Sequence, residues 1–225
     1  MTEKHVLIAG ASRGLGLGLA EHLLARGWRV TATQRTASPG LQALARPELQ
    51  VETVDIDDDG AVAALQERLA EARYDLVFVV AGISNGAATP MPQISRATAA
   101  QIFQTNSVSP IQFAEAFAAQ VQPGGTVAFM TSILGSVSGN TRGGWEVYRA
   151  SKAALNTLGR SFQLRHAKAG WDVVLMHPGW VRTDMGGQSA DIDTETSVRG
   201  MLDVLAQTGR KGCSYLDYQG RTVAW

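Results

Sequence analysis

Tyr148 and Lys152 stand four residues apart in the segment WEVYRASK, which runs from Trp145 to Lys152. On a helix this spacing places both side chains on one face, one turn apart. An ammonium beside a phenol favours the phenolate, so such a pair can transfer a proton near neutral pH. The alternative for this pair alone is a packed tyrosine beside a solvated lysine. The choice between the two depends on the elements that surround the pair.

A glycine-rich turn follows the first apolar run of the chain. Residues 5–9 predict a strand, and the sequence GASRGLG at residues 10–16 precedes a helical pattern of leucines. Glycines in such a turn let the backbone approach a pyrophosphate, and the helix N-terminus supplies N–H groups. The spacing G-x3-G-x-G differs from the G-x-G-x-x-G fingerprint, so an ordinary strand–helix turn is the alternative. The candidate phosphate-binding residues are Gly10, Ser12, Arg13, Gly14, Leu15 and Gly16.

The second predicted strand, residues 28–33, leads into Gln34 and Arg35 without a carboxylate. A unit that binds NAD usually places an acid about 20 residues past the glycines, on the ribose 2′-hydroxyl. Arg35 and Arg13 instead offer guanidinium groups, whose geometry suits a 2′-phosphate. We therefore expect NADP(H) in preference to NAD(H). Two solvated surface arginines are the alternative.

Strands and helices alternate along the rest of the chain. Further strands are predicted at residues 49–56, 75–81, 126–131, 171–176 and 213–217, and helices at residues 95–120, around Tyr148 and Lys152, and at residues 196–208. This alternation predicts a doubly wound α/β fold, a Rossmann-type parallel sheet of about seven strands with helices on both faces. We expect one dinucleotide-binding domain over residues 1–225.

Two more residues could take part in chemistry. Asn106 stands among apolar positions of the helix expected at residues 95–120, and Pro110 follows four residues later. Proline has no N–H for the carbonyl of residue i−4, so the Asn106 carbonyl should be free to hold a water. A proline kink with Asn106 as a bystander is the alternative. Ser132 ends the fifth predicted strand, and ligands bind at the carboxyl ends of parallel strands.

The charge balance and cysteine content exclude several classes of protein. Lysine plus arginine and aspartate plus glutamate each number 20, so there is no strong field for nucleic acid or an anionic membrane. Cys213 is the only cysteine, which excludes an intramolecular disulfide and suits a reducing compartment. No segment approaches ~20 continuous apolar residues, so we expect a soluble, cytoplasmic protein. No metal site is expected at Asp57-Asp58-Asp59, because no histidine or ordered spacing of acids accompanies them.

Taken together, the motifs resemble the short-chain dehydrogenase/reductase family over essentially the whole chain, and within it the C-factor-like and small carbonyl reductase subgroup. They stand in the order of that family. They are the GASRGLG turn, Asp55-Ile56, Ala81-Gly82, Asn106, Ser132, Tyr148-x-x-x-Lys152 and Pro178-Gly179-x-Val181-x-Thr183. One departure is Val79-Val80-Ala81-Gly82, where the family often has Asn-Asn-Ala-Gly. That departure concerns the bracing of the sheet and not the catalytic residues.

The resemblance implies an NADP(H)-dependent oxidoreductase that reduces an aldehyde or ketone, or oxidises the alcohol. In the family pattern Tyr148 is the proton donor or acceptor, and Lys152 lowers its pKa and holds the nicotinamide ribose. Ser132 hydrogen-bonds the substrate oxygen and stabilises the charge that develops there. The Asn106 carbonyl holds a water that links Lys152 to solvent.

The same resemblance implies the cofactor contacts. Asp55 and Ile56 should meet the adenine, and Val181 and Thr183 should hold the carboxamide. The remaining cofactor-binding positions are Ala81, Gly82, Pro178 and Gly179, beside the glycine turn, Arg35, Tyr148 and Lys152.

Four apolar or aromatic residues should flank the substrate: Ile133, Leu134, Trp145 and Trp180. They predict an apolar pocket, and no basic cluster apart from Arg142 favours an anionic substrate. Tryptophans that serve as core or interface residues are the alternative. The resemblance leaves the assembly open between a monomer, a homodimer and a homotetramer. It also leaves a second function open, an NADP-binding signalling or regulatory protein of the C-factor type without turnover.

Overall fold

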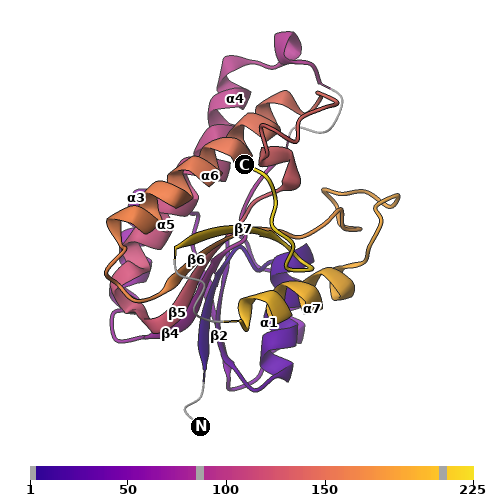
Figure 1. Cartoon of the computed structure of the whole chain (residues 1–225). Coiled ribbons are helices and arrows are strands. Elements are labelled where there is room, and N and C mark those ends of the chain that lie inside the picture. Colours follow the sequence, from indigo (N-terminus) through magenta and orange to yellow (C-terminus); the bar gives the residue numbers. More distant parts are fainter. Residues whose placement is uncertain (1–3, 85–88, 208–211) are drawn as a thin grey trace.

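The computed structural model describes residues 4–84, 89–207 and 212–225, and its strands form a parallel sheet (Figure 1). The order across this seven-stranded sheet is β3-β2-β1-β4-β5-β6-β7. The strands are β1 (His5–Ala9), β2 (Arg29–Gln34), β3 (Leu49–Thr53), β4 (Tyr74–Val79), β5 (Val121–Met130), β6 (Asp172–His177) and β7 (Cys213–Asp217). The order reverses beside β1, so β1 and β4 flank the switch point where such sheets bind ligands. The predicted Rossmann-type fold is confirmed.

Helices cover both faces of the sheet (Figure 1). They are α1 (Gly14–Ala25), α2 (Pro39–Ala43), α3 (Asp59–Arg68), α4 (Arg96–Phe103), α5 (Ser109–Phe117), α6 (Glu146–Arg165) and α7 (Thr194–Leu205). Several of them begin at a residue whose side chain accepts a hydrogen bond from the first turn, such as Ser38, Asp58, Ser95 and Asp193. Such N-caps satisfy N–H groups that the helix itself leaves free.

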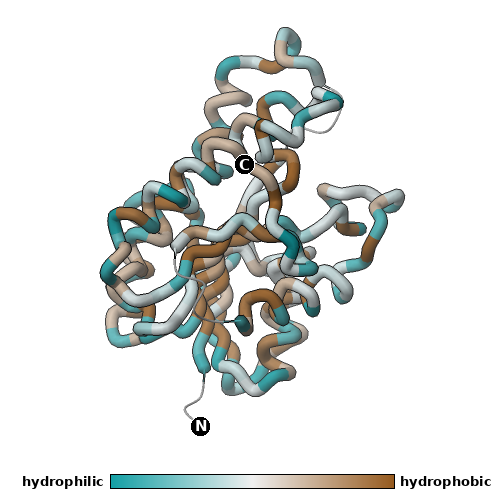
Figure 2. Tube along the Cα trace, in the orientation of Figure 1, coloured by the Kyte–Doolittle hydropathy of each residue, from teal (hydrophilic) through white to brown (hydrophobic). Residues whose placement is uncertain are grey.

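Two hydrophobic cores lie on the two faces of the sheet. Because side chains alternate along a strand, Val6 and Ile8 of β1 pack with α1 and α7, whereas Leu7 and Ala9 pack with α3, α5 and α6. The strands are consequently the most continuously hydrophobic part of the chain (Figure 2). Burial on both faces keeps the sheet rigid, and the rigid sheet positions the loops at its carboxyl edge.

Several boundaries differ from the predicted ones. The strand predicted at residues 126–131 begins at Val121, and its first part includes Pro123, Gly124 and Gly125, which the sequence favoured as a turn. The register between β4 and β5 shifts between Tyr74 and Leu76, so this part of β5 is an irregular extension of the ladder. Helix α7 begins at Thr194, two residues early, and the predicted end at residue 208 lies outside the described residues.

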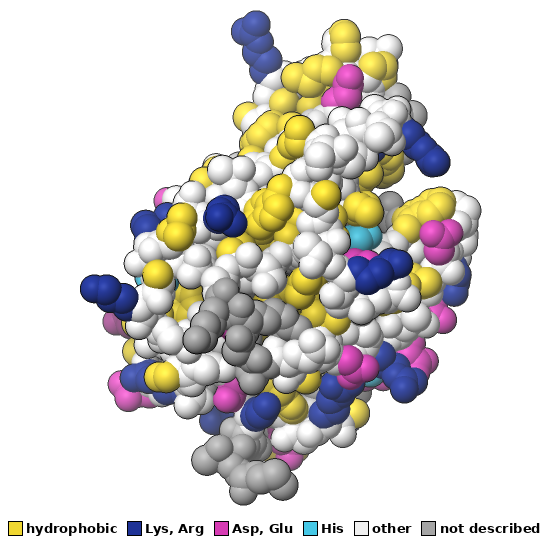
Figure 3. Space-filling model, in the orientation of Figure 1, with side chains coloured by type: hydrophobic (Ala, Val, Ile, Leu, Met, Phe, Trp, Pro, Cys, Tyr) yellow, Lys and Arg dark blue, Asp and Glu magenta, His cyan; other side chains and the backbone are white. Residues whose placement is uncertain are grey.

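On the face shown in Figure 3, basic and acidic side chains are interspersed with apolar ones. Among the described helices, none combines the length and the apolar character that crossing a bilayer requires.

Candidate active site

Helix α6 carries Tyr148 and Lys152 near its start, and both side chains point into the protein. Tyr148 is 9% exposed and Lys152 is 3% exposed. The Lys152 ammonium donates to the Met130 carbonyl of β5 at 3.0 Å and lies 5.8 Å from the centre of the Tyr148 ring. The predicted pairing on one face of a helix is therefore present. The alternative of a solvated lysine is wrong.

The electrostatics of the pair differ from the expectation. Burial raises the pKa of Tyr148 to about 12, although a hydrogen bond with the Ser132 side chain acts in the opposite direction. Burial likewise lowers the pKa of Lys152 to about 8. In this arrangement desolvation outweighs any lowering of the Tyr148 pKa by Lys152, whose ammonium bonds the Met130 carbonyl. Tyr148 is thus a protonated phenol at neutral pH.

Ser132 lies directly beyond β5 and faces Tyr148. Its side chain is hydrogen-bonded to the Tyr148 phenol. Its oxygen also accepts from the Leu134 N–H at 3.1 Å, which caps the short 3₁₀ turn Ile133–Gly135. Two hydroxyl groups therefore converge at the carboxyl end of β5, where a substrate oxygen could bind both.

Asn106 is fully buried, and its side chain connects two parts of the site. Its Nδ2 donates to the Ile83 carbonyl at 2.8 Å and to Ser151 Oγ at 3.1 Å, and its Oδ1 accepts from the Ile83 N–H at 2.8 Å. Asn106 thereby holds the loop after β4 against α6. The sequence suggested a role for the carbonyl of Asn106 only and missed this role of the side chain. A polar residue at a core position of a helix was the available signal.

The helix predicted at residues 95–120 is not one continuous helix. Helix α4 ends at Phe103, a π-helical turn covers Gln104–Val108, and α5 restarts at Ser109. Pro110 lies in the first turn of α5, where a missing N–H costs little. The interruption is therefore a π turn centred on Asn106 rather than a proline kink. Such turns occur frequently at functional sites.

Lys152, Asn106 and Gly82 come together at the end of β4. A Cβ placed on Gly82 would stand 3.2 Å from Asn106 Oδ1 and 3.3 Å from Lys152 Nζ. A side chain at Gly82 would press on both groups, and the predicted Ala81-Gly82 motif lies beside the catalytic candidates.

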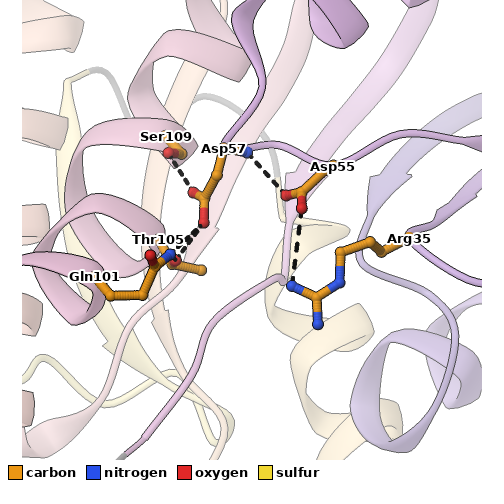
Figure 4. A network of polar contacts seen from close by, with 6 residues as sticks. All are labelled: Arg35, Asp55, Asp57, Gln101, Thr105 and Ser109. Atoms are coloured by element: carbon orange, nitrogen blue, oxygen red, sulfur yellow. Dashed lines mark hydrogen bonds and ion pairs between the residues drawn. The ribbon is translucent and has the colours of Figure 1, made fainter. Parts of the chain in front are cut away.

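A network of hydrogen bonds from Asp57 supports the π turn (Figure 4). Its carboxylate accepts from Ser109 Oγ at 2.6 Å, from Thr105 Oγ1 at 2.5 Å and from Gln101 Nε2 at 2.9 Å. The Asp57 N–H donates to Asp55 Oδ1 at 3.0 Å. The local sequence around Asp57 does not indicate this role, because its partners lie more than 40 residues further along the chain. The cap of α3 is Asp58.

The glycine turn after β1 is tightly packed and leaves its helix end open. Gly10 has a φ of +92°, and a Cβ there would stand 2.8 Å from the backbone of Ala81. A Cβ on Gly16 would meet the Gly10 carbonyl at 2.1 Å. Arg13 at the start of α1 makes no side-chain cap, and the first turn contains no acid. Backbone N–H groups without a carboxylate in front of them fit a dinucleotide pyrophosphate.

Arg13 and Arg35 flank this turn, and each has a carboxylate partner. Arg13 lies 2.9 Å from Asp184. Arg35 lies 3.9 Å from Asp55, and Figure 4 shows this second pair. All four side chains are well exposed to solvent, so these ion pairs contribute little to stability. A phosphate could therefore take the place of either carboxylate at small cost. Both arginines are also exposed to solvent, so the alternative of solvated surface arginines stays open.

The loop after β6 contacts the glycine turn. The Thr183 methyl lies 3.6 Å from the position of a Cβ on Gly14. Gly179 has a φ of +86°, and Val181 forms a β-bridge with Ile192. The predicted Pro178-to-Thr183 motif is thus next to the predicted phosphate-binding turn.

The residues predicted to contact substrate differ in their surroundings. Trp145 has a left-handed backbone with a φ of 53°, and its ring packs edge-on against Tyr148 at 5.7 Å. Ile133 and Trp180 are 51% and 50% exposed, and Leu134 is partly buried. The structure thus places Trp145 against the Tyr148 phenol and leaves Ile133 and Trp180 exposed to solvent. The described residues contain no group of three or more histidine, cysteine or acidic side chains suited to a metal.

Comparisons with known proteins agree with this geometry. A family model described as short chain dehydrogenase matches residues 4–193. C-signal of Myxococcus xanthus is 39% identical over 158 residues, which cover 67% of this chain and 92% of that protein. A short-chain dehydrogenase/reductase from Burkholderia multivorans, with bound NADP, is 41% identical with a TM-score of 0.95 over 99% of this chain and 100% of that one. A carbonyl reductase from Pseudomonas aeruginosa PAO1 in complex with NADP is 39% identical with a TM-score of 0.91, over 100% of both chains.

Proposed function

Since the chain belongs to the short-chain dehydrogenase family, a family of oxidoreductases, we propose that it reduces an aldehyde or ketone with NADPH. The reverse reaction would oxidise the corresponding alcohol. One observation carries this proposal. A buried, protonated Tyr148 shares a hydrogen bond with Ser132 at the carboxyl end of β5, while Lys152 and Asn106 meet beside it.

The residues around the switch point fit NADP(H). The backbone of the glycine turn would hold the pyrophosphate, and Arg13 and Arg35 would hold the 2′-phosphate. NADP bound to the similar Burkholderia and Pseudomonas proteins supports this assignment. The remaining contacts would come from Asp55 and Ile56 at the adenine, Ala81 and Gly82 beside the riboses, Lys152 at the nicotinamide ribose, and Pro178, Gly179, Val181 and Thr183 at the carboxamide. When bound, the nicotinamide supplies the hydride.

The residues of the chain supply the proton and the orientation. The Tyr148 and Ser132 hydroxyls would bind the carbonyl oxygen together, and Tyr148 would donate its proton to that oxygen. A phenol with a pKa near 12 carries its proton at neutral pH but is a weak acid, so transfer of the proton requires stabilisation of the phenolate. The Lys152 ammonium would favour the phenolate that remains after the transfer. We assign to the Asn106 carbonyl a water that returns a proton through Lys152.

The substrate pocket would be apolar. Trp145 against Tyr148, together with Ile133, Leu134 and Trp180, offers aromatic and aliphatic surface around the two hydroxyls. Arg142 is exposed, and we assign it no substrate contact. We therefore propose aromatic or aliphatic aldehydes and ketones as substrates in preference to carbonyl compounds that carry a carboxylate.

The test is oxidation of NADPH by the purified protein with matched carbonyl compounds, such as benzaldehyde and a keto acid, with the alcohol identified as product. We expect turnover with a higher kcat/KM for the neutral aldehyde. A clear preference for the keto acid would refute the apolar pocket. No turnover across a broad panel of aldehydes and ketones would refute the reductase.

C-signal of Myxococcus xanthus supports a second candidate function, an NADP-binding signalling or regulatory protein. This function requires cofactor binding but no proton donor. Binding of NADPH without turnover of any carbonyl compound would favour it. Turnover that depends on Tyr148 would favour the reductase.

A further inference from the structure

Tyr215 of β7 has no role in the assignments above, yet its hydroxyl reaches Ser132 at the carboxyl end of β5. Its side chain is 1% exposed and lies in the same hydrophobic core as Phe129 of β5 and Leu155 of α6. Across the ladder, Tyr215 pairs with Leu175, which pairs with Phe129. From this position the phenol donates to the Ser132 carbonyl at 2.5 Å. The Ser132 backbone is thus held by a side chain from β7, the outermost strand on that side of the sheet.

The Tyr215 hydroxyl belongs to a network that spans both sides of Ser132. Asn156, one turn after Lys152 on α6, is hydrogen-bonded to the Tyr215 side chain. The same amide accepts from Thr131 Oγ1 at 2.7 Å and donates to the Gly135 carbonyl at 3.4 Å. Ser132 therefore lies between two residues, Thr131 and Gly135, that are hydrogen-bonded to Asn156.

Trp225 adds a second connection between the end of the sheet and this loop. Its ring packs edge-on against Tyr215 at 5.6 Å. Its main-chain oxygen accepts from the Ser138 N–H at 3.1 Å and from Ser138 Oγ at 2.6 Å. The loop that follows Ser132 is consequently fixed by the same part of the chain that buries Tyr215.

We propose that Tyr215 is a positioning residue for the reaction, and that its hydrogen bond to the Ser132 carbonyl orients the Ser132 hydroxyl toward Tyr148. This inference rests on the proposed reductase function. Ser132 has extended backbone angles, φ −153° and ψ 148°, and its carbonyl otherwise accepts only a local bond from the Gly135 N–H at 2.8 Å among the described residues. A peptide with one short-range bond can rotate, and rotation would carry the side chain away from the phenol. Displacements of about 1 Å in an active site can lower rates by 10²-fold.

The test is a double-mutant cycle between Tyr215→Phe and Ser132→Ala, measured as kcat/KM for the carbonyl substrate. We expect Tyr215→Phe to lower kcat/KM by roughly 10- to 100-fold in the wild-type background. In the Ser132→Ala background the same change should have no further effect, because residues that act through one another are not additive. KM for NADPH should remain unchanged. Equal losses in both backgrounds, or no loss in either, would overturn the proposal.

Tyr74→Phe is the matched control. Tyr74 is buried as completely as Tyr215, but it is the first residue of β4 and lies at the amino end of the strands, away from the site. Loss of its hydroxyl should therefore leave kcat/KM unchanged. Trp225→Ala is a second variant for the case that Tyr215→Phe folds poorly. It removes a partly exposed ring that packs on Tyr215 and should give a smaller loss that also disappears in the Ser132→Ala background.

A crystal structure of Tyr215→Phe separates failure of this inference from failure of the proposed function. If wild type turns over no carbonyl compound, the reductase function fails, but the expected rotation of Ser132 away from Tyr148 can still be observed. An unchanged Ser132 in that structure would overturn the positioning role, whether or not the protein is a reductase.

Discussion

At the scale of single residues, the environment of Tyr148 determines the protonation state of its phenol. Burial in a low-dielectric site disfavours the phenolate, so the phenol holds its proton to about pH 12. Ser132 provides a hydroxyl on one side and Trp145 an aromatic ring on another. These surroundings keep the phenol in its protonated form in the resting protein.

Replacing Tyr148 by phenylalanine removes the donor and leaves the ring in place. We expect kcat for NADPH-dependent reduction to fall by ~10²-fold or more, with a similar Tm and little change in NADPH affinity. Steady-state kinetics, thermal unfolding and cofactor titration measure these three quantities. A variant with near-normal kcat would refute the assignment of Tyr148 as the donor.

Arg35→Asp tests the predicted contact with the 2′-phosphate. A hydrogen bond to a charged group contributes about 1.5–3 kcal/mol, so kcat/KM with NADPH should fall by about 10- to 100-fold. The value with NADH should hold or rise, because a carboxylate can accept from the 2′-hydroxyl. The same charge reversal at Arg96, exposed in the first turn of α4, is the control and should change neither value. A wild-type protein that prefers NADH would contradict the prediction at once.

At the scale of elements, the π turn Gln104–Val108 is the feature that places Asn106 in the site. A π turn carries an additional residue per turn and is less stable than continuous α-helix, so neighbouring contacts must hold it. Asp57 provides them through bonds to Gln101, Thr105 and Ser109, which lie on both sides of the turn. The loop after β3 thereby supports the helix that carries a catalytic candidate.

Asp57→Asn should disturb this element, because an amide offers one acceptor oxygen where the carboxylate uses two. We expect a loss of about 1–3 kcal/mol in the free energy of unfolding and a lower Tm, together with a lower kcat as Asn106 shifts. Thermal unfolding and steady-state kinetics of the variant test both effects. Asp59→Asn, exposed in the first turn of α3, is the control and should cost a few tenths of a kcal/mol at most. If Asp57→Asn lowers neither Tm nor kcat, Asp57 does not support the π turn.

At the scale of the whole molecule, two histidines make folding sensitive to acid. His5 at the start of β1 and His177 at the end of β6 each have a pKa lowered to about 4, chiefly because burial disfavours the charged ring. The unfolded chain therefore binds more protons than the folded chain between about pH 6.5 and pH 4. Stability rises with pH wherever the unfolded state binds more protons.

We accordingly expect Tm to fall as the pH decreases through that window and to level off with respect to these two groups below it. Thermal unfolding at a series of pH values measures the effect. Replacing His177 by glutamine should reduce the slope between pH 6.5 and pH 4 without removing it, because His5 remains. A wild-type Tm that is constant across this window would show that neither ring is buried in its neutral form.

The amino-acid sequence alone determined the fold class and the candidate catalytic residues, because both depend on short-range patterns. The strand–turn–helix order around the GASRGLG motif and the four-residue spacing of Tyr148 and Lys152 are local, and the structure retains both. Apolar strands that alternate with helices have few ways to bury both faces of a sheet, so the seven-stranded architecture followed from the same patterns.

Only the tertiary structure decided the features that depend on distant residues. Tyr215 bonds Ser132 across 83 positions of the chain, and Asp57 bonds Thr105 across 48. The direction of the pKa shift of Tyr148 was also decided there, since desolvation depends on everything packed around the phenol and not on the lysine four residues away. Hydrophobic periodicity indicates which face of an element is buried, but it does not indicate which polar groups meet once the elements pack. In this protein, such long-range hydrogen bonds connect Ser132 to β7 and the π turn to the loop after β3.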